Sequence, residues 1–357
     1  MTVNYVSIIV GTRPQIIKIP ILVQELRKRK LKLSIIHTGQ HYDYEMSRRF
    51  FRELDIPKPT INLNVGADTP IAQISKIIMK LEHIFLKNKP DLVLVPGDTT
   101  SAIGAALATS KCDISLAHLE AGARSNQFHM AEEINRRMID HCSNLLFAPT
   151  KNCFNNLKNE NVFGSSYFVG DTMYDLFVRQ YKQYNLKSVK SSENEVLLTI
   201  HRRENIEKFV NLKKICSIIN KLSEYGLKII FPIHPHTQKN LEKFRLKINA
   251  DFIEPLGYTS TLRMIVRSKF VITDSGGLQK ESYWAGKPCI TLRNSTEWIE
   301  TVKEGANLLL PINKENKIKN IIRMSEKVIL PKPALFGSGK AAERISYIIK
   351  HFQDTRS

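Results

Sequence analysis

Three carboxylates in the first half of the chain stand at the ends of apolar runs or at the start of a helix-like segment. Asp98 follows the run 92–96, Glu120 follows 116–119, and Glu132 opens a helix-like segment. Any one of them could simply cap a helix. If they lie together at one edge of a sheet, they raise one another's pKa values, and a carboxyl group becomes a usable acid or base near neutral pH. Their positions therefore favour a site that transfers protons.

The second half contains a glycine turn that is typical of phosphate-binding sites. The segment DSGGLQKE lies between an apolar run and a probable helix, so backbone N–H groups point outward at the positive end of the helix dipole. Gly276 and Gly277 allow close approach of an anion, and Ser275 can donate its hydroxyl. Glu281, about a turn and a half into the helix, could hold a sugar diol. Plain turns use the same residues, so the segment alone is weak evidence.

Basic side chains follow the first strand-like run of each half. Arg13 and Lys18 lie in GTRPQIIK, where they could face a ligand or belong to an ordinary surface turn. His201, in TIHRREN, could carry a proton or assist a departing phosphate, and it could equally be a structural histidine. His234 and His236 lack a third ligand, so we predict no metal site.

The elements that would position these residues alternate along the chain. Short apolar runs are followed by helix-like segments nearly from end to end, which predicts parallel sheets covered on both faces. We expect an α/β protein with two doubly wound Rossmann-like domains facing a cleft, where ligands bind beyond the carboxyl ends of the strands. A polar stretch at 185–194 interrupts the alternation. The predicted domains are 1–175 and 176–336, and a terminal amphipathic helix lies within 337–357.

The pattern also predicts individual elements. The expected strands are 6–10, 33–37, 92–95, 114–117, 145–147, 166–169, 196–200, 228–231, 251–253, 270–273, 289–292 and 307–310. The expected helices of the first domain include 14–30, 42–54 and 101–110.

Composition excludes several classes of protein. Apolar residues make up 42% and charged residues 24% of the 357 residues, as in globular proteins, and no apolar run approaches the length of a membrane span. The first residues lack a signal peptide pattern, so we expect a cytoplasmic protein without membrane partners. Five cysteines without a C-x-x-C pair indicate neither a disulfide framework nor a zinc site. The net charge of +19 is spread along the chain, so we expect no nucleic-acid partner.

Nine segments, in order from residue 11 to residue 345, resemble the non-hydrolysing UDP-N-acetylglucosamine 2-epimerases. That family shares the GT-B architecture with many nucleotide-sugar glycosyltransferases. The resembling segments are GTRPQIIK, TGQHYD, GDTTSA, HLEAGARS, EEINRR, GDTMYD, TIHRREN, DSGGLQKE and GSGKAAERI. Because they occur in family order and span nearly the whole chain, together they are far more specific than any one of them.

The resemblance implies a role for each candidate residue. The catalytic residues would be Asp98, Glu120, Glu132 and His201, with His201 near the diphosphate. The substrate-binding residues would be Arg13, Lys18, Leu256, Ser275, Gly276, Gly277 and Glu281, with Leu256 facing the uracil and Glu281 the ribose. The resemblance also implies a cytoplasmic homodimer whose last helix crosses back onto the first domain.

The chemistry of such a reaction agrees with this set of residues. The hydrogen at C2 of the sugar has no neighbouring carbonyl, so its direct removal is very slow. Expulsion of UDP from C1 makes that proton removable and leaves a 2-acetamidoglucal, and UDP adds back after reprotonation on the other face. This route needs a well-held diphosphate and acid or base groups on both faces of C2. It needs no cofactor.

Three positions depart from the family pattern. Trp298 stands where many members have a substrate-side arginine, and a tryptophan is also found in relatives acting on UDP-2,3-diacetamido-2,3-dideoxyglucuronate. Asp43 stands where regulated members carry a second glutamine after Gln40, so allosteric activation is not expected. Ala131 replaces a usual proline before Glu132, which should be tolerated.

Several alternatives remain open from the sequence. The main prediction is interconversion of UDP-GlcNAc and UDP-ManNAc. The close rivals are the 2,3-diacetamido uronate epimerase and a hydrolysing epimerase that releases ManNAc and UDP. Outside that class stand a GT-B glycosyltransferase and, because of the positive charge, a polyanion-binding protein.

Overall fold

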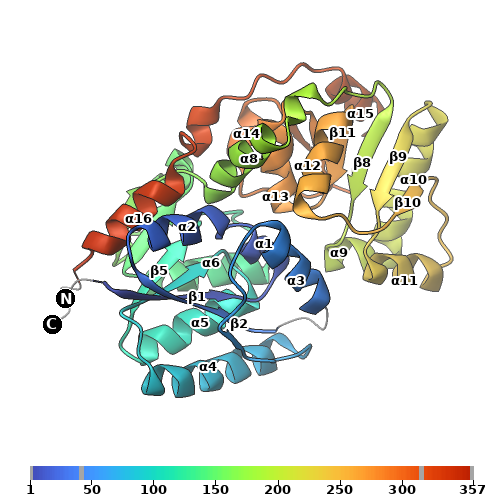
Figure 1. The fold of residues 1–357 in the computed structure, drawn as a ribbon. Coiled ribbons are helices and arrows are strands. Elements are labelled where there is room, and N and C mark those ends of the chain that lie inside the picture. The colour runs from blue at the N-terminus through green and yellow to red at the C-terminus, as the bar shows by residue number, and fades with distance from the viewer. Residues whose placement is uncertain (1–2, 40–43, 313–316, 354–357) are drawn as a thin grey trace. The chain divides into compact units, whose positions relative to one another are not determined.

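The computed structural model describes residues 3–39, 44–312 and 317–353, which fold into two compact units. The first unit comprises residues up to Val178 together with Pro333 and those that follow, and the second unit runs from Arg179 to Lys332. Each unit contains one parallel sheet with helices on both faces (Figure 1). Within the described ranges, none of the helices has the length and apolar character needed to cross a membrane.

The sheet of the first unit has seven strands in the order β3-β2-β1-β4-β5-β6-β7. The strands are β1 (Tyr5–Val10), β2 (Lys32–His37), β3 (Ile61–Asn62), β4 (Leu92–Pro96), β5 (Ser115–Leu119), β6 (Leu145–Ala148) and β7 (Ser165–Phe168). All neighbours pair in parallel, and the order reverses between β1 and β4. In doubly wound sheets, ligands bind beyond the strand ends at this point of reversal.

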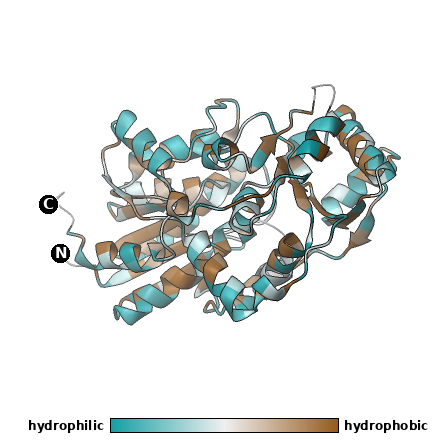
Figure 2. Ribbon diagram, turned by 90° about the horizontal axis from the view of Figure 1, so that it is seen from above, coloured by the Kyte–Doolittle hydropathy of each residue, from teal (hydrophilic) through white to brown (hydrophobic). Residues whose placement is uncertain are grey.

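The central strands are nearly all apolar because both faces of the sheet are covered. Every residue of β4 and β5 is buried, and the core between sheet and helices includes Ile9, Val93 and Leu81. In Figure 2 the brown of apolar residues is concentrated in the strands, whereas the outer faces of the helices carry most of the teal. This is the pattern expected for a parallel sheet inside an α/β unit.

Helices of the first unit differ in two places from the sequence-based expectation. The helices are α1 (Arg13–Ile16), α2 (Pro20–Lys28), α3 (Tyr44–Glu53), α4 (Pro70–Lys87), α5 (Thr100–Lys111), α6 (Ala131–Cys142), α7 (Lys151–Asn159), α8 (Thr172–Gln183), which continues into the second unit, and α16 (Ala341–His351). The single helix predicted at 14–30 was wrong, because Pro20 cannot continue α1 and instead starts α2. Neither β3 nor α4 was predicted.

The second unit has six parallel strands in the order β10-β9-β8-β11-β12-β13. They are β8 (Glu195–Thr199), β9 (Lys228–Pro232), β10 (Asp251–Ile253), β11 (Phe270–Thr273), β12 (Cys289–Thr291) and β13 (Asn307–Leu309). The helices are α9 (Arg203–Ile206), α10 (Phe209–Glu224), α11 (Pro235–Lys243), α12 (Tyr258–Arg267), α13 (Gly276–Trp284), α14 (Ile299–Lys303) and α15 (Lys317–Ser325), with short 3-10 turns at Leu186–Ser188 and Pro333–Phe336, the latter already in the first unit. The order reverses between β8 and β11, the two strands followed by His201 and by the glycine turn.

The C-terminal helix α16 packs against α2 of the first unit (Figure 1). Its first two N–H groups, of Ala341 and Ala342, donate to the carboxylate of Asp175 over 3.1 and 2.7 Å. Farther along, Nε of Arg29 donates to the Ser346 hydroxyl over 2.7 Å. Asp175 thus satisfies part of a helix terminus that would otherwise be buried without partners.

Candidate functional site

Two of the predicted carboxylates lie at the same edge of the first sheet. Strands β4 and β5 are parallel neighbours whose last residues, Pro96 and Leu119, pair with each other. Asp98 and Glu120 follow these ends by two residues and one residue, so both lie at the carboxyl edge next to the point of strand reversal. Glu120 adopts a left-handed backbone with φ 75°, which is uncommon for a residue other than glycine and typical of functional sites.

The first sheet also brings Lys18 to Glu120. The Nζ atom of Lys18 and Oε2 of Glu120 form an ion pair, with the two side chains only 9% and 12% exposed. Lys18 lies in the turn between α1 and α2. A Cβ atom on Gly97 would lie 2.8 Å from Nζ of Lys18, so a glycine at this position leaves room for the ammonium. Two predicted site residues that are far apart in sequence are therefore in direct contact.

Asp98 is held by a residue that the sequence analysis did not single out. Nε of Arg136 donates to Oδ2 of Asp98 over 2.7 Å, and the Asn135 amide donates to the Asp98 carbonyl over 2.9 Å. Both donors lie on α6 within the segment EEINRR. The arginine was visible in that segment, but its target lies 38 residues earlier.

The adjacent glutamates of α6 have opposite environments. Glu133 is fully buried and accepts hydrogen bonds from the N–H and hydroxyl of Ser125 over 2.8 and 3.0 Å. Burial alone would raise its pKa, but the Ser125 hydrogen bonds and the Arg136 charge outweigh burial and lower it. Glu132 is partly exposed, and no hydrogen bond or ion pair to it is found among the described residues. Glu132 is therefore the glutamate available to a ligand.

In the segment after β1, Arg13 lies at the surface and Gln15 lies in the core. Arg13 is exposed, and its guanidinium carbon lies 4.7 Å from the centre of the Phe50 ring. Gln15 is fully buried, accepts the Gly11 N–H over 2.8 Å and donates to the Pro96 carbonyl over 2.9 Å. Gln15, which the sequence analysis passed over, thus ties the first loop to the end of β4.

In the second unit, Asp274 joins the His201 loop to the glycine turn. Asp274 is fully buried and accepts backbone N–H groups of His201 and Arg202 over 3.1 and 3.0 Å. Nδ1 of His201 lies 3.2 Å from the same carboxylate, while 53% of the His201 side chain is exposed. Asp274 orients His201 and leaves the rest of the ring open to a ligand. The sequence analysis quoted Asp274 within its segment without giving it this role.

The glycine turn itself opens α13. Ser275 is the N-cap residue and its side chain makes no capping hydrogen bond, so its hydroxyl is not used by the helix. A Cβ atom on Gly276 would lie 2.5 Å from Oε1 of Glu297, so only glycine fits there without a shift. Glu281 is 2% exposed on the buried face of α13, and Leu256 is partly buried between β10 and α12.

Trp298 lies behind this turn and is only 2% exposed. Its ring faces the ammonium of the fully buried Lys280, with Nζ 3.9 Å from the ring centre. A Cβ atom on Gly276 would lie 3.4 Å from the Trp298 indole nitrogen. Trp298 stands where many members of the resembling family have an arginine, and the positive charge recorded against its ring is that of Lys280. The residues Gln40 and Asp43 lie outside the described part of the chain.

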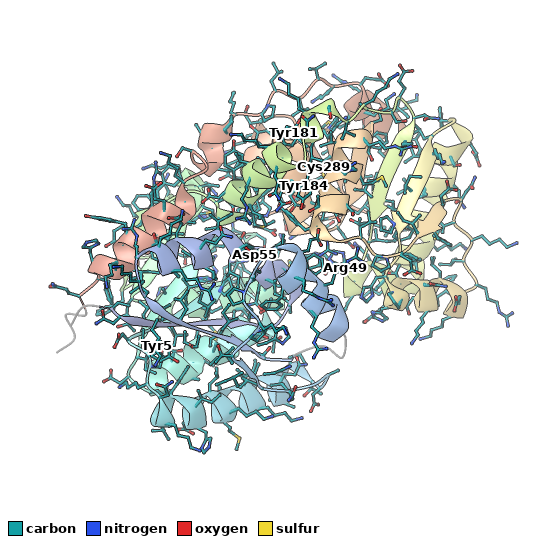
Figure 3. All side chains as sticks on the ribbon, viewed as in Figure 1. Tyr5, Arg49, Asp55, Tyr181, Tyr184 and Cys289 are labelled. Atoms are coloured by element: carbon teal, nitrogen blue, oxygen red, sulfur yellow. The ribbon has the colours of Figure 1, made fainter. Side chains whose placement is uncertain are left out.

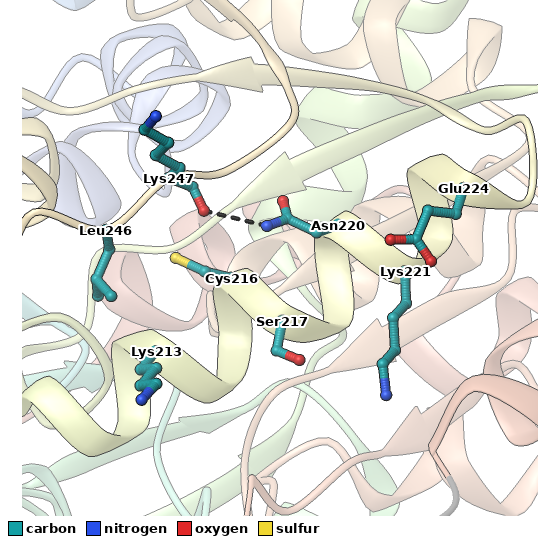
Figure 4. Close-up of a pocket in the computed structure, with 8 residues that line it drawn as sticks. All are labelled: Lys213, Cys216, Ser217, Asn220, Lys221, Glu224, Leu246 and Lys247. Carbon is teal, nitrogen blue, oxygen red and sulfur yellow. Dashed lines mark hydrogen bonds between the residues drawn. The ribbon is translucent and has the colours of Figure 1, made fainter.

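In the part of the chain that the structure describes, the pocket on α10 and two cysteines of the second unit offer no competing site for this chemistry. A pocket on α10 is lined by Lys213, Cys216, Ser217, Asn220, Lys221, Glu224, Leu246 and Lys247 (Figure 4), none of them a predicted site residue. Burial raises the pKa of the Cys216 thiol to about 11 and that of Cys289, labelled in Figure 3, to about 12. These thiols therefore stay protonated and are poor nucleophiles.

The chain is similar over nearly its whole length to known sugar-nucleotide epimerases. The family model described as UDP-N-acetylglucosamine 2-epimerase matches residues 24–350. A Methanococcus maripaludis protein named UDP-N-acetylglucosamine 2-epimerase homolog is 45% identical over 362 residues, covering 96% of this chain and 98% of the relative. The UDP-2,3-diacetamido-2,3-dideoxy-D-glucuronate 2-epimerase of Pseudomonas aeruginosa is 38% identical and covers 96% of this chain and 98% of its own length.

A solved structure extends the similarity to the fold. The Methanocaldococcus jannaschii UDP-GlcNAc 2-epimerase, crystallised in complex with UDP-GlcNAc and UDP, matches with a TM-score of 0.91 at 40% identity, covering 98% of this chain and 100% of that chain. With the two parallel sheets, this match confirms the predicted GT-B architecture. The chain belongs to the UDP-N-acetylglucosamine 2-epimerase family, whose members are isomerases.

Proposed function

We propose that this protein interconverts UDP-GlcNAc and UDP-ManNAc without net hydrolysis. The observation that carries the proposal is the similarity, over 98% of the chain, to an epimerase structure that holds UDP-GlcNAc and UDP. The substrate named for that structure fits the residues described above. The glycine turn and His201 suit a diphosphate, and the carboxylates of the first unit suit proton transfer.

In the proposed reaction the C1–O bond to the diphosphate breaks, and UDP leaves with the bonding electrons. A carboxylate takes the proton from C2, and a C1–C2 double bond forms to give the 2-acetamidoglucal. A second carboxyl group, which is protonated at this stage, then gives its proton to C2 on the opposite face and becomes a carboxylate, and a UDP oxygen re-forms the bond to C1. Atoms and charge balance over the cycle, since one proton leaves and one is added.

The environments of several side chains support the proposed roles. Backbone N–H groups at the start of α13, together with Ser275, would hold the phosphate oxygens, where charge develops as UDP departs. Glu120 has Lys18 as a counter-charge, and Glu132 has an open carboxylate, so these two suit opposite faces of C2. Asp98 would orient the sugar or share the proton, and Arg13, Leu256 and Glu281 would contact the remaining parts of the nucleotide sugar.

Isotope exchange tests this proposal. The protein is incubated with UDP-GlcNAc in D2O, and deuterium at C2 is followed by NMR. Deuterium incorporation without net loss of nucleotide is expected, and its absence would defeat the proposal. Glu120→Gln and Glu132→Gln should abolish exchange while UDP binding, measured by calorimetry, stays largely intact. Glu224→Gln, at an exposed position of α10, is the matched control.

Two rivals share the fold. Trp298 and the Pseudomonas aeruginosa relative favour the 2,3-diacetamido uronate as a second candidate substrate, although that relative is less similar than the one named for UDP-GlcNAc. A panel of UDP-sugars with NMR analysis of products separates the two substrates. Release of free ManNAc together with UDP would indicate the hydrolysing reaction instead.

We also propose a cytoplasmic homodimer that serves polysaccharide biosynthesis. Five unpaired cysteines suit a reducing compartment. On α4, Ile71, Met79 and Leu86 are 78%, 69% and 79% exposed and lie on one side of the helix, which supports a contact with a second copy. Leu86→Lys should shift the mass measured by light scattering toward the monomer. Val328→Lys, at another exposed apolar position, should not.

A further inference from the structure

A buried histidine links the two loops that carry Asp98 and Glu120. His118, the fourth residue of β5, is fully buried. Its Nδ1 lies 2.6 Å from Oδ1 of Asp140 on α6, and its Nε2 lies 3.0 Å from the carbonyl oxygen of Gly97. Gly97 immediately precedes Asp98. The histidine therefore acts on the backbone next to a predicted catalytic residue, without lying at the surface itself.

The hydrogen bonds require His118 to be an imidazolium. Oδ2 of Asp140 accepts from Nη2 of Arg124 over 2.7 Å and from the N–H of Gly122 over 3.1 Å. Burial would raise the pKa of Asp140, but the pKa is lowered overall; Arg124 contributes to that lowering independently of His118, and its hydrogen bond together with that of the Gly122 N–H favours a carboxylate. The Gly97 carbonyl can only accept. Both ring nitrogens of His118 must then donate, which requires two protons on the ring.

The charge balance around the histidine supports the same protonation state. A closed circuit of ion pairs runs from Asp98 through Arg136, Glu133, Arg137, Glu160, Arg124 and Asp140 to His118, whose bond to Gly97 returns to Asp98. The circuit holds four carboxylates and three arginines, so a cationic His118 balances its charges; His141, half exposed, lies 4.0 Å from Glu160 at its edge and is not counted. Neutrality matters because an uncompensated buried charge is strongly destabilising.

We propose that His118 and Asp140 are a positioning pair that holds the Asp98 and Glu120 loops in register for proton transfer at C2. The proposal rests on the proposed epimerase function. His118 fixes the carbonyl before Asp98, and Asp140 fixes the N–H of Gly122, two residues after Glu120. A buried ion pair rarely stabilises a fold more than apolar packing does. Precise placement of the Asp98 and Glu120 carboxylates accounts for the buried pair of His118 and Asp140, whereas stability alone does not.

The protonation state can be tested without any activity. In protein labelled with 15N-histidine, the two ring nitrogens of His118 should both show protonated chemical shifts and N–H couplings at about pH 7.5, because both face acceptors. The signals are assigned by their loss in His118→Gln. A neutral ring at about pH 7.5 would overturn the proposal, whether or not the protein is an epimerase.

Kinetics then separate positioning from folding. In Asp140→Asn the imidazolium loses its counter-charge, so the Asp98 loop should shift and the kcat of C2 exchange should fall on the order of 100-fold, with the Kd for UDP changed less than about twofold. The pH profile of kcat should also move. Asp113→Asn, on an exposed turn, is the matched control and should behave like the parent.

Two results would contradict the positioning role. One is a folded Asp140→Asn with kcat within about threefold of the parent, and the other is a parallel loss of UDP binding and exchange. If Asp140→Asn does not fold, the NMR measurement on the parent protein decides. Failure of the parent to exchange deuterium would refute the proposed function instead, and that outcome is distinct from a neutral His118.

Discussion

Replacing Asp175 by asparagine should change how the stability of the protein depends on pH. Asp175 is 5% exposed, and its carboxylate accepts the first two N–H groups of α16. Burial raises the pKa of this carboxyl from its ordinary 3.8 to about 6, and the nearby Asp171 adds to the rise. The two N–H groups and Arg344 oppose the rise without cancelling it. Ionised Asp175 thus holds the helix at a net electrostatic cost.

The sign and size of the effect follow from linkage. Because the pKa of Asp175 is higher in the folded state than in the unfolded state, the folded state binds the proton more tightly. Protonation of Asp175 therefore adds to the free energy of unfolding, fully below about pH 4, and this addition is lost as pH rises through about 6. The difference between 3.8 and about 6 corresponds to at most about 3 kcal/mol. Asparagine cannot ionise, so it should keep this stability at neutral pH while one amide oxygen still accepts from α16.

The assay is urea unfolding of the parent and of Asp175→Asn at several pH values from about 4.5 to 7.5. The free energy of unfolding of the variant, relative to the parent, should rise with pH and level off above about pH 6.5. Asp251→Asn, whose side chain is 59% exposed, is the matched control. A difference that stays constant within about 0.5 kcal/mol over this range would refute the argument that burial dominates at Asp175.

Three further variants test contacts at the site. Gly276→Ala should weaken UDP binding at least about tenfold in calorimetry, because its Cβ would lie 2.5 Å from Oε1 of the buried Glu297 and either that side chain or the turn must shift; unchanged affinity would contradict the predicted phosphate site. Gly97→Ala should slow C2 exchange about tenfold or more while UDP binding persists. Gly97 has φ +69°, which strains any residue with a Cβ, and the added Cβ would push Nζ of Lys18 away from Glu120. Lys280→Met and Trp298→Leu should show a coupling of about 1–2 kcal/mol in a double-mutant cycle of urea unfolding, and independent effects would argue against their cation–π contact.

The local sequence pattern predicted most helices and strands, but the predictions were wrong where proline and helix-capping signals were overlooked. The helix expected at 14–30 ends early because Pro20 starts a new helix. Helix α4 was missed although Ile77, Leu81 and Phe85 recur at a helical spacing and Thr69 caps its start through the Ala72 N–H. Strand β3 has only two residues, too few for any periodic signal. Asp98 and Glu120 lie where they were expected, because both follow strands that were predicted, whereas Lys18, expected within the helix 14–30, lies in the turn between α1 and α2.

The amino-acid sequence by itself determined the two parallel sheets and which residue types stand at their carboxyl ends. Alternation of apolar runs with helical segments is a local property, and so are the turn at Gly276 and the carboxylates after β4 and β5. Only the tertiary structure decided the partners of those carboxylates. Lys18 reaches Glu120 across 102 residues and Arg136 reaches Asp98 across 38, because strand order brings distant loops to one sheet edge. An ion pair depends on that placement in space, which local propensity does not contain.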